Sequence, residues 1–117
     1  MLNLSLGKAG ETVAGKFLLA SGFSILDKNY KCYLGEIDLI ATRRDVLYFT
    51  EVKTRTSLTH GWPAESVTLR KQNKLRKLAL YYLSAQAYRG PVAFGVVEVL
   101  YNPWRRRYQV NFIPDAF

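Results

Sequence analysis

The 117-residue sequence predicts an α/β fold in which helices cover both faces of a central mixed β-sheet. Helical and strand patterns follow one another in the order α-β-β-β-α-β-β. A long helix separates the third strand from the fourth, and a crossover of this length joins parallel strands. The segments IDLIA (37–41) and VLYF (46–49) are almost continuously apolar, which is typical of strands covered on both faces. These features predict a three-layer α/β/α architecture.

The first helix is expected over residues 8–20, where apolar residues recur at helical spacing. Gly22, just beyond it, is a typical stop signal at a helix C-terminus. The expected inward stripe consists of Ala9, Val13, Phe17 and Ala20, widened by Ala14 and Leu18. Projection along the helix places Glu11 at the edge of this inward face. Glu11 is therefore either a candidate functional carboxylate or a first-turn acid favoured by the helix dipole.

The other elements follow from strand, turn and cap signals. Strands are expected over residues 23–33 (irregular), 35–41, 46–54, 92–101 and 108–113, with a turn at 42–45 and a loop at 55–67. Thr68 should cap a second helix that runs to about Gln86, where the breakers Arg89, Gly90 and Pro91 follow. The inward side of this helix is expected to contain Leu75, Leu78, Ala79, Tyr82 and Leu83.

The composition indicates one basic domain over residues 1–117, because 49% hydrophobic residues in this length suffice for one core. Seventeen Lys and Arg against nine Asp and Glu give a net charge of +8, which suits a polyanionic partner. Nucleic acid is the leading class, ahead of an anionic membrane or ribosome surface. Cys32 is the only cysteine, which excludes an intramolecular disulfide, and no apolar run resembles a leader or membrane span. We therefore expect a cytoplasmic protein without a membrane partner.

Four charged residues interrupt the apolar strands of the first hairpin: Glu36, Asp38, Glu51 and Lys53. If the turn is centred between positions 44 and 45, opposed residues sum to 89, so Asp38 faces Glu51 and Glu36 faces Lys53. Carboxylates this close in a partly buried place repel, so either one stays protonated or a cation lies between them. Mg²⁺ is the usual cation for oxygen ligands on a phosphate substrate. The alternative is an ion-pair cluster on an exposed strand face.

These motifs, taken in order, resemble a known family. GEIDLI (35–40) and FTEVKTR (49–55), with GKAGETVA (7–14) upstream and RKQNKLRKLALYYL (70–83) downstream, look like the bacterial YraN family. That family is placed in the PD-(D/E)xK nuclease superfamily, near the archaeal Holliday junction resolvases. The resemblance covers nearly the whole chain and implies a restriction-endonuclease-like version of the three-layer fold.

By this resemblance the protein is a DNA endonuclease that depends on Mg²⁺ or Mn²⁺ and favours branched DNA such as Holliday junctions. Asp38 and Glu51 would be the metal ligands, assisted by Glu11, and Lys53 would position or deprotonate the attacking water. The eponymous proline is replaced by Ile37, as is common in the family. A second departure is the presence of Ala93 and Gly95 where the family usually has Arg and Asp.

The second helix carries the strongest basic signal, because no acidic residue occurs between Ser66 and Val97. The candidate DNA-binding residues are Arg55, Arg70, Lys71, Gln72, Lys74 and Lys77. A solvated basic face is the alternative for the cations, whereas the planar fork of Arg55 suits a phosphate. Gln72 projects toward the apolar side, where it is either a satisfied core amide or a residue that touches the active site or phosphate.

The remaining residues of interest carry weaker signals. His60 is expected at the surface, and Trp62 either stacks on a base or, more simply, packs the loop. Arg105, Arg106 and Arg107 either extend the basic surface or form a solvated turn. A homodimer would suit a symmetric junction cutter. The competing functions are a non-catalytic nucleic-acid-binding module and a structural protein that binds a ribonucleoprotein through charge.

Overall fold

The computed structural model describes residues 6–56 and 67–117. Two helices and five strands occur in the predicted order and close to the predicted bounds: α1 Leu6–Ala20, β1 Ser24–Cys32, β2 Gly35–Arg43, β3 Val46–Arg55, α2 Leu69–Gln86, β4 Val92–Asn102 and β5 Arg107–Ile113. The expectations for His60 and Trp62 lie outside the described residues.

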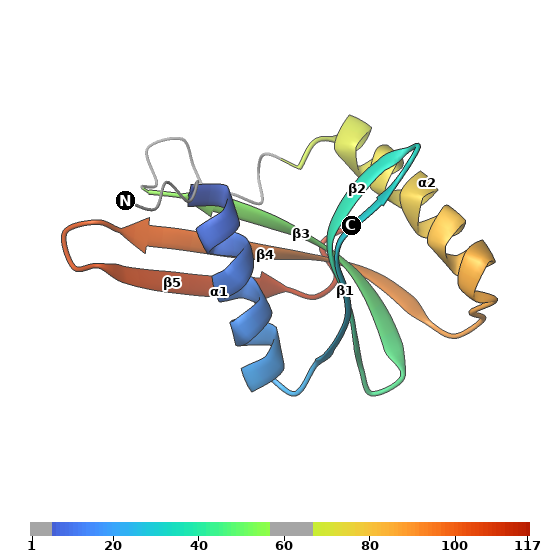
Figure 1. Cartoon of the computed structure of the whole chain (residues 1–117), viewed down its shortest axis with the longest axis horizontal. Coiled ribbons are helices and arrows are strands. Elements are labelled where there is room, and N and C mark those ends of the chain that lie inside the picture. Colours follow the sequence, from blue (N-terminus) through green and yellow to red (C-terminus); the bar gives the residue numbers. More distant parts are fainter. Residues whose placement is uncertain (1–5, 57–66) are drawn as a thin grey trace.

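The five strands form one mixed sheet with the order β1-β2-β3-β4-β5. Neighbouring strands are antiparallel except β3 and β4, which are parallel and are connected through α2. Helices α1 and α2 cover opposite faces of this sheet, as Figure 1 shows. Leu39 and Ala41 of β2 belong to the core beneath α1, whereas Ile40 and Phe49 belong to the core beneath α2. The predicted α/β/α layering with a mixed sheet is therefore present.

Local signals fix the ends of the elements. Gly22 has a positive φ of 89° and the Phe23 amide donates to the Leu18 carbonyl, so α1 ends where the sequence predicts. Arg44 and Asp45 have φ values of 52° and 66°, as a two-residue hairpin turn requires. Thr68 caps α2 by accepting a hydrogen bond from the Lys71 amide at 3.3 Å. Neither of the helices described is long and apolar enough to cross a membrane.

The inward face of α2 agrees with the prediction, but the inward face of α1 is rotated from the expected stripe. The buried residues of α1 are Gly10, Ala14, Gly15 and Leu18, whereas Val13 and Phe17 are half-buried and Ala20 is exposed. A Cβ added at Gly10 would overlap the side chain of Thr54 in β3, with only 2.9 Å to its Cβ. The absence of a side chain at Gly10 thus lets α1 approach β3 closely, and Glu11 follows directly after this contact.

Replacing Gly10 by alanine is expected to destabilise the protein by about 1–3 kcal/mol, because the added methyl group overpacks the α1–β3 contact. Gly15→Ala is the matched control, since a Cβ there meets only the end of the Lys28 side chain at 3.8 Å. The control should instead gain about 0.5–1 kcal/mol from helix propensity. Urea unfolding of both variants measures the difference, and equal stabilities would contradict this account of the helix contact.

Candidate functional site

The β2–β3 hairpin has the predicted register only up to one point. Opposed residues sum to 89 from Arg43–Val46 to Leu39–Thr50, where the pairing stops. Beyond it, the backbone N–H of Val52 donates to Asp38 Oδ2 at 2.8 Å. A side-chain carboxylate has replaced a backbone partner, so the two strands separate. The expectation that Asp38–Glu51 and Glu36–Lys53 are directly opposed ladder pairs is therefore wrong.

The pairing of β2 with its other neighbour, β1, is also interrupted at Asp38 and resumes beyond it. The β1–β2 register passes from Lys28–Leu39 to Tyr30–Ile37, and the intervening Asn29 has a left-handed φ of 53°. Ile37 and Ile40 both lie in the core beneath α2, although an odd separation normally places residues on opposite faces. The alternation therefore shifts once at Asp38, and its carboxylate lies where residues from both sides of the sheet can approach it.

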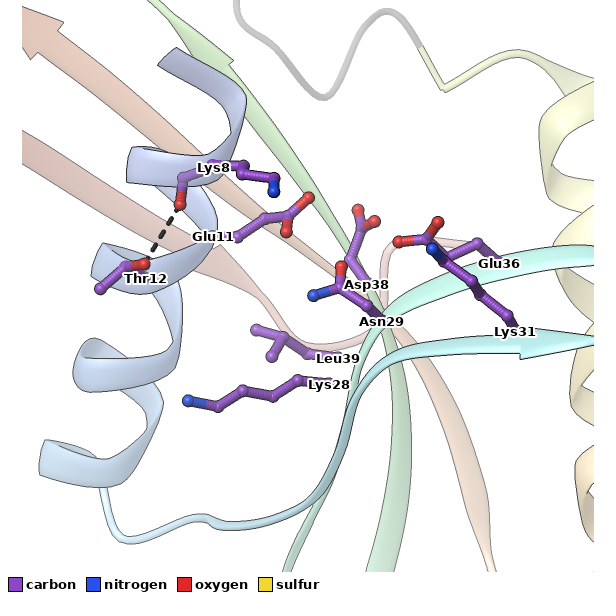
Figure 2. A pocket seen from close by; sticks show the side chains of 9 residues that line it. All are labelled: Lys8, Glu11, Thr12, Lys28, Asn29, Lys31, Glu36, Asp38 and Leu39. Atoms are coloured by element: carbon purple, nitrogen blue, oxygen red, sulfur yellow. Dashed lines mark hydrogen bonds between the residues drawn. The ribbon is translucent and has the colours of Figure 1, made fainter. Parts of the chain in front are cut away.

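Asp38 is the most perturbed titratable group of the site. Its pKa is raised from 3.8 to about 7, chiefly by burial, although the Val52 hydrogen bond acts in the opposite direction. The negative charges of Glu51, Glu11 and Glu36 contribute to the same rise. Figure 2 shows the carboxylates of Glu11, Asp38 and Glu36 directed toward one another. Three other carboxylates thus act on Asp38 without the predicted ladder pairs, and its ionised form is disfavoured unless a cation compensates it.

Asn29 bridges two of these carboxylates through its side-chain amide. With its amide nitrogen turned toward them, it donates to Glu36 Oε1 at 2.8 Å and to Glu11 Oε1 at 3.0 Å. Burial and the charge of Glu36 raise the pKa of Glu11, with Lys8 and Asn29 offsetting part of the effect. The sequence reading missed Asn29, although Asn within an expected strand is one of the residues that most often adopt a left-handed φ.

Lys53 lies on the α2 side of the site. Its Nζ is 3.1 Å from Glu51 Oε1, and the two side chains are 19% and 24% exposed. Burial lowers the pKa of Lys53, but the hydrogen bond with Lys71 and the charge of Glu51 outweigh it and leave that pKa raised. The same hydrogen bond and the positive charge of Lys53 lower the pKa of Lys71. Lys71, expected only as a DNA contact, therefore belongs to the site itself.

Two hollows flank the acidic group. The larger, of about 430 Å³, is lined by Lys8, Glu11, Thr12, Lys28, Asn29, Lys31, Glu36, Asp38 and Leu39 (Figure 2). The smaller, of about 170 Å³, is lined by Glu36, Glu51, Lys71, Lys74, Leu75 and Leu78. Each hollow thus combines carboxylates with lysines. Lys8, Lys28 and Lys31 were not predicted as site residues, because regular alternation would place Lys28 and Lys31 on opposite faces of the strand. The left-handed φ of Asn29 brings both to one hollow.

The oxygen donors of the site meet only part of the needs of a divalent cation. No group of three or more His, Cys, Asp and Glu side chains among residues 6–56 and 67–117 is arranged to hold a metal by itself. Mg²⁺ does not need such a group, because it usually binds one or two carboxylates, with waters and substrate phosphates completing the octahedron. Asp38 Oδ2 accepts the hydrogen bond from the Val52 amide, and the second carboxylate oxygen of Asp38 can bind the cation. The donor set therefore fits a Mg²⁺ shared with substrate but not a closed protein cage.

The five candidate DNA-binding residues other than Lys71 divide into three groups. Arg70, Lys74 and Lys77 are exposed on α2, where they line an open hollow of about 610 Å³. Gln72 donates from Nε2 to the Val67 carbonyl at 3.2 Å, so its amide is satisfied by the chain that precedes α2. Arg55, at the end of β3, has a buried Nε without a hydrogen-bond partner in the described part of the chain. Contact of these residues with DNA stays a prediction.

The two departures at positions 93 and 95 lie beneath α1. Ala93 is opposite Tyr48 and Gly95 is opposite Thr50 in the parallel ladder. A Cβ at Gly95 would lie 2.8 Å from the Phe112 ring, and Phe112 in turn packs edge-on against Tyr48 at 6.0 Å. The Thr50 hydroxyl is buried without a hydrogen-bond partner among the described residues. An aromatic cluster thus fills this region, and the departure changes packing beneath α1 without removing any of the charged side chains described above.

Comparison with known proteins identifies the family. Residues 10–99 match the family described as uncharacterised protein family UPF0102. A UPF0102 protein of Clostridium botulinum (strain Loch Maree / Type A3) is 41% identical over 117 residues, which cover 98% of this chain and 95% of the relative. One from Clostridium perfringens is 43% identical over 116 residues, with 98% and 95% covered. One from Clostridium novyi (strain NT) is 39% identical, with 98% and 97% covered. The chain therefore belongs to the UPF0102 family, the YraN-like family that its sequence motifs indicate.

Proposed function

We propose that this protein is a metal-dependent DNA endonuclease with a restriction-endonuclease-like fold, a member of the PD-(D/E)xK superfamily. The observation that carries the proposal is the convergence of Asp38 with three other carboxylates beside the Lys53–Glu51 pair. A half-buried carboxylate whose charge is disfavoured, within a cleft that has basic walls, is typical of a functional site. A purely structural ion-pair cluster would not require a carboxylate with a pKa near 7.

The roles follow from the positions of the side chains. Asp38 and Glu51 would bind Mg²⁺ or Mn²⁺, and Glu11 would support them through its negative charge. When bound, the cation would act as a Lewis acid and lower the pKa of an attacking water. The ammonium group of Lys53 would hold that water or a non-bridging phosphate oxygen, because it is charged and paired with a ligand of the metal.

The surrounding cations would hold the DNA backbone. Lys71 and Lys74 line the smaller hollow next to Glu51, and Arg70 and Lys77 continue the basic surface along α2. The unpartnered Nε of Arg55 suits a phosphate oxygen. A preference for branched DNA, a homodimer that cuts two strands and a cytoplasmic location complete the proposal.

Purified protein is expected to nick supercoiled plasmid and cut a four-way junction in Mg²⁺ or Mn²⁺, but not in EDTA. Glu51→Gln should lose this activity and still bind the same DNA, because it removes a ligand charge and leaves the α2 surface intact. Gel analysis of products and a filter-binding assay measure the two effects. Wild-type protein that binds each substrate and cuts none, with either metal, would reject the nuclease and favour the non-catalytic binding module.

A further inference from the structure

The tip of the β4–β5 hairpin exposes a large aromatic side chain. Trp104 is 94% exposed, the highest value among the exposed large hydrophobic residues of the described chain. Tryptophan carries one of the largest apolar surfaces of any side chain, so leaving it in water forgoes a sizeable hydrophobic gain. The ring of Trp104 at the end of the hairpin is therefore available for contact with a partner.

The turn that presents Trp104 is well built. The side-chain oxygen of Asn102 accepts hydrogen bonds from the amides of Trp104 at 3.0 Å and Arg105 at 3.2 Å. Arg106 has the left-handed φ of 51° that closes a four-residue hairpin loop. The rings of Tyr101 and Tyr108, opposed in the β4–β5 ladder, contact each other at a tilt of 40° with 4.8 Å between their centroids. The backbone conformation is thus fixed by local bonds that do not involve the Trp104 ring.

The tip is also strongly basic. Trp104 is followed by Arg105, Arg106 and Arg107, and all three are exposed. Within residues 6–56 and 67–117, the ion pair between Lys53 and Glu51 does not involve any of these arginines. Arg105, Arg107 and Tyr108 line a hollow of about 240 Å³ at the base of the tip. An exposed aromatic ring next to several cations is the combination that binds single-stranded nucleic acid, where the ring stacks on a base and the cations hold phosphates.

The ladder gives the distance from the acidic site. Glu51 is opposite Val96, and Arg55 is opposite Leu100, four residues further along β4. Asn102 lies six residues beyond Val96, which corresponds to about 20 Å of strand. At the duplex rise of roughly 3.4 Å per nucleotide along one strand, this distance corresponds to about six stacked nucleotides. A strand that leaves the acidic site along β3 and β4 would pass the unpartnered Nε of Arg55 before it reaches the tip.

We propose that the β4–β5 tip is a second nucleic-acid contact, in which Trp104 stacks on an unpaired base and Arg105, Arg106 and Arg107 hold the adjacent phosphates. The placement about six nucleotides from the cut rests on the proposed nuclease function, but the contact itself does not. The ligand is single-stranded DNA or the unpaired part of a branched DNA, because bases within a duplex offer no free face to the ring.

The first test uses Trp104 as its own reporter. In a Trp62→Phe background Trp104 is the only tryptophan, and single-stranded oligo(dT)20 without metal should quench its fluorescence. Trp104→Ala should weaken binding of oligo(dT)20 about tenfold, whereas Trp104→Phe, which keeps an aromatic face, should stay within about twofold of the parent. Leu19→Ala removes another exposed apolar side chain, on α1, and should change nothing.

A blunt 20-base-pair duplex is the matched probe. Trp104→Ala should bind this duplex as the parent does, while the triple replacement of Arg105, Arg106 and Arg107 by alanine should weaken both probes. The salt dependence for oligo(dT)20 should lose a slope of about 2, since each phosphate contact contributes about 0.7. Unchanged binding of oligo(dT)20 by Trp104→Ala would overturn the proposal. Quenching by poly-glutamate in place of oligo(dT)20 would also overturn it, in favour of an acidic protein partner.

The two proposals can fail separately. A protein that cuts DNA, and whose Trp104→Ala variant binds oligo(dT)20 normally, would keep the nuclease function and lose the tip contact. A protein that never cuts but shows ring-dependent binding of oligo(dT)20 would lose the nuclease function and keep the tip contact.

Discussion

Replacement of Lys53 by methionine is expected to slow Mg²⁺-dependent DNA cleavage by about 10²–10³-fold, the usual effect of removing one group that stabilises transition-state charge. Methionine keeps much of the length and apolar stem of lysine and removes the charge beside Glu51. DNA affinity should stay within about twofold, because Lys53 is largely buried and the exposed cations of α2 remain. Single-turnover cleavage and equilibrium binding of the same junction DNA measure the two quantities.

The control for this experiment is Lys77→Met, which removes an exposed cation of the same type from α2. It should weaken DNA binding and reduce its salt dependence, while the cleavage rate of fully bound DNA stays unchanged. A Lys53→Met variant that cuts bound DNA at the wild-type rate would contradict the role given to this ammonium group. Circular dichroism of both variants establishes that they are folded.

Replacement of Asp38 by asparagine is expected to stabilise the metal-free protein by up to about 4 kcal/mol at pH 8. The folded pKa is about 7 and the ordinary value is 3.8, a difference of 3.2 units at 1.36 kcal/mol each. Because the folded pKa is the higher one, the native protein retains a proton that the unfolded chain releases. The stability of the wild type therefore falls as the pH rises from about 4 to about 7. Asparagine has no proton to release, and its side-chain oxygen can still accept the Val52 bond.

Urea unfolding at pH 5 and pH 8, in EDTA, compares the two proteins. The difference in unfolding free energy between Asp38→Asn and wild type should be small at acidic pH and should grow toward pH 8. Saturating Mg²⁺ should reduce the difference, because a bound cation stabilises only the wild-type carboxylate. Parallel stability curves at all pH values would show that burial does not disfavour the charge of Asp38. The stability that Asp38→Asn gains by losing a proposed metal ligand would be an example of the common trade-off between stability and function.

The elements and the first hairpin could be predicted from sequence because their causes are local. Helical and strand spacing, the Thr68 cap, the Gly22 stop and the turn at Arg44 and Asp45 each depend on a few neighbouring residues. The hairpin turn fixed the register from Arg43–Val46 to Leu39–Thr50, which ends just before Asp38 and Glu51. The point where the β2–β3 pairing ends could not be predicted, because it depends on a tertiary contact. The Val52 amide donates its hydrogen bond to the Asp38 side chain in place of a backbone carbonyl.

Two other features escaped prediction for a related reason. Hydrophobic spacing gives glycine no weight, yet Gly10 and Gly15 lie on the buried face of α1, so the predicted stripe was rotated. Strand periodicity assumes regular alternation, yet the left-handed Asn29 brings Lys28 and Lys31 to the same hollow. In both cases the backbone geometry determined which side chains face inward, and hydrophobicity patterns alone do not reveal that geometry.

The separation of β2 from β3 divides the acidic group between two parts of the molecule. Past Leu39, strands β1 and β2 continue as a two-stranded arm, which Figure 1 shows curving toward α2. The arm contacts this helix through the Tyr30–Tyr82 and Tyr33–Tyr81 ring pairs, at 5.2 and 5.5 Å. Asp38 lies at the root of the arm, whereas Glu51 belongs to the central sheet. The distance between the Asp38 and Glu51 carboxylates therefore depends on how the arm packs against α2. Substitution of Tyr81 or Tyr82 is expected to change that distance without altering any charged residue.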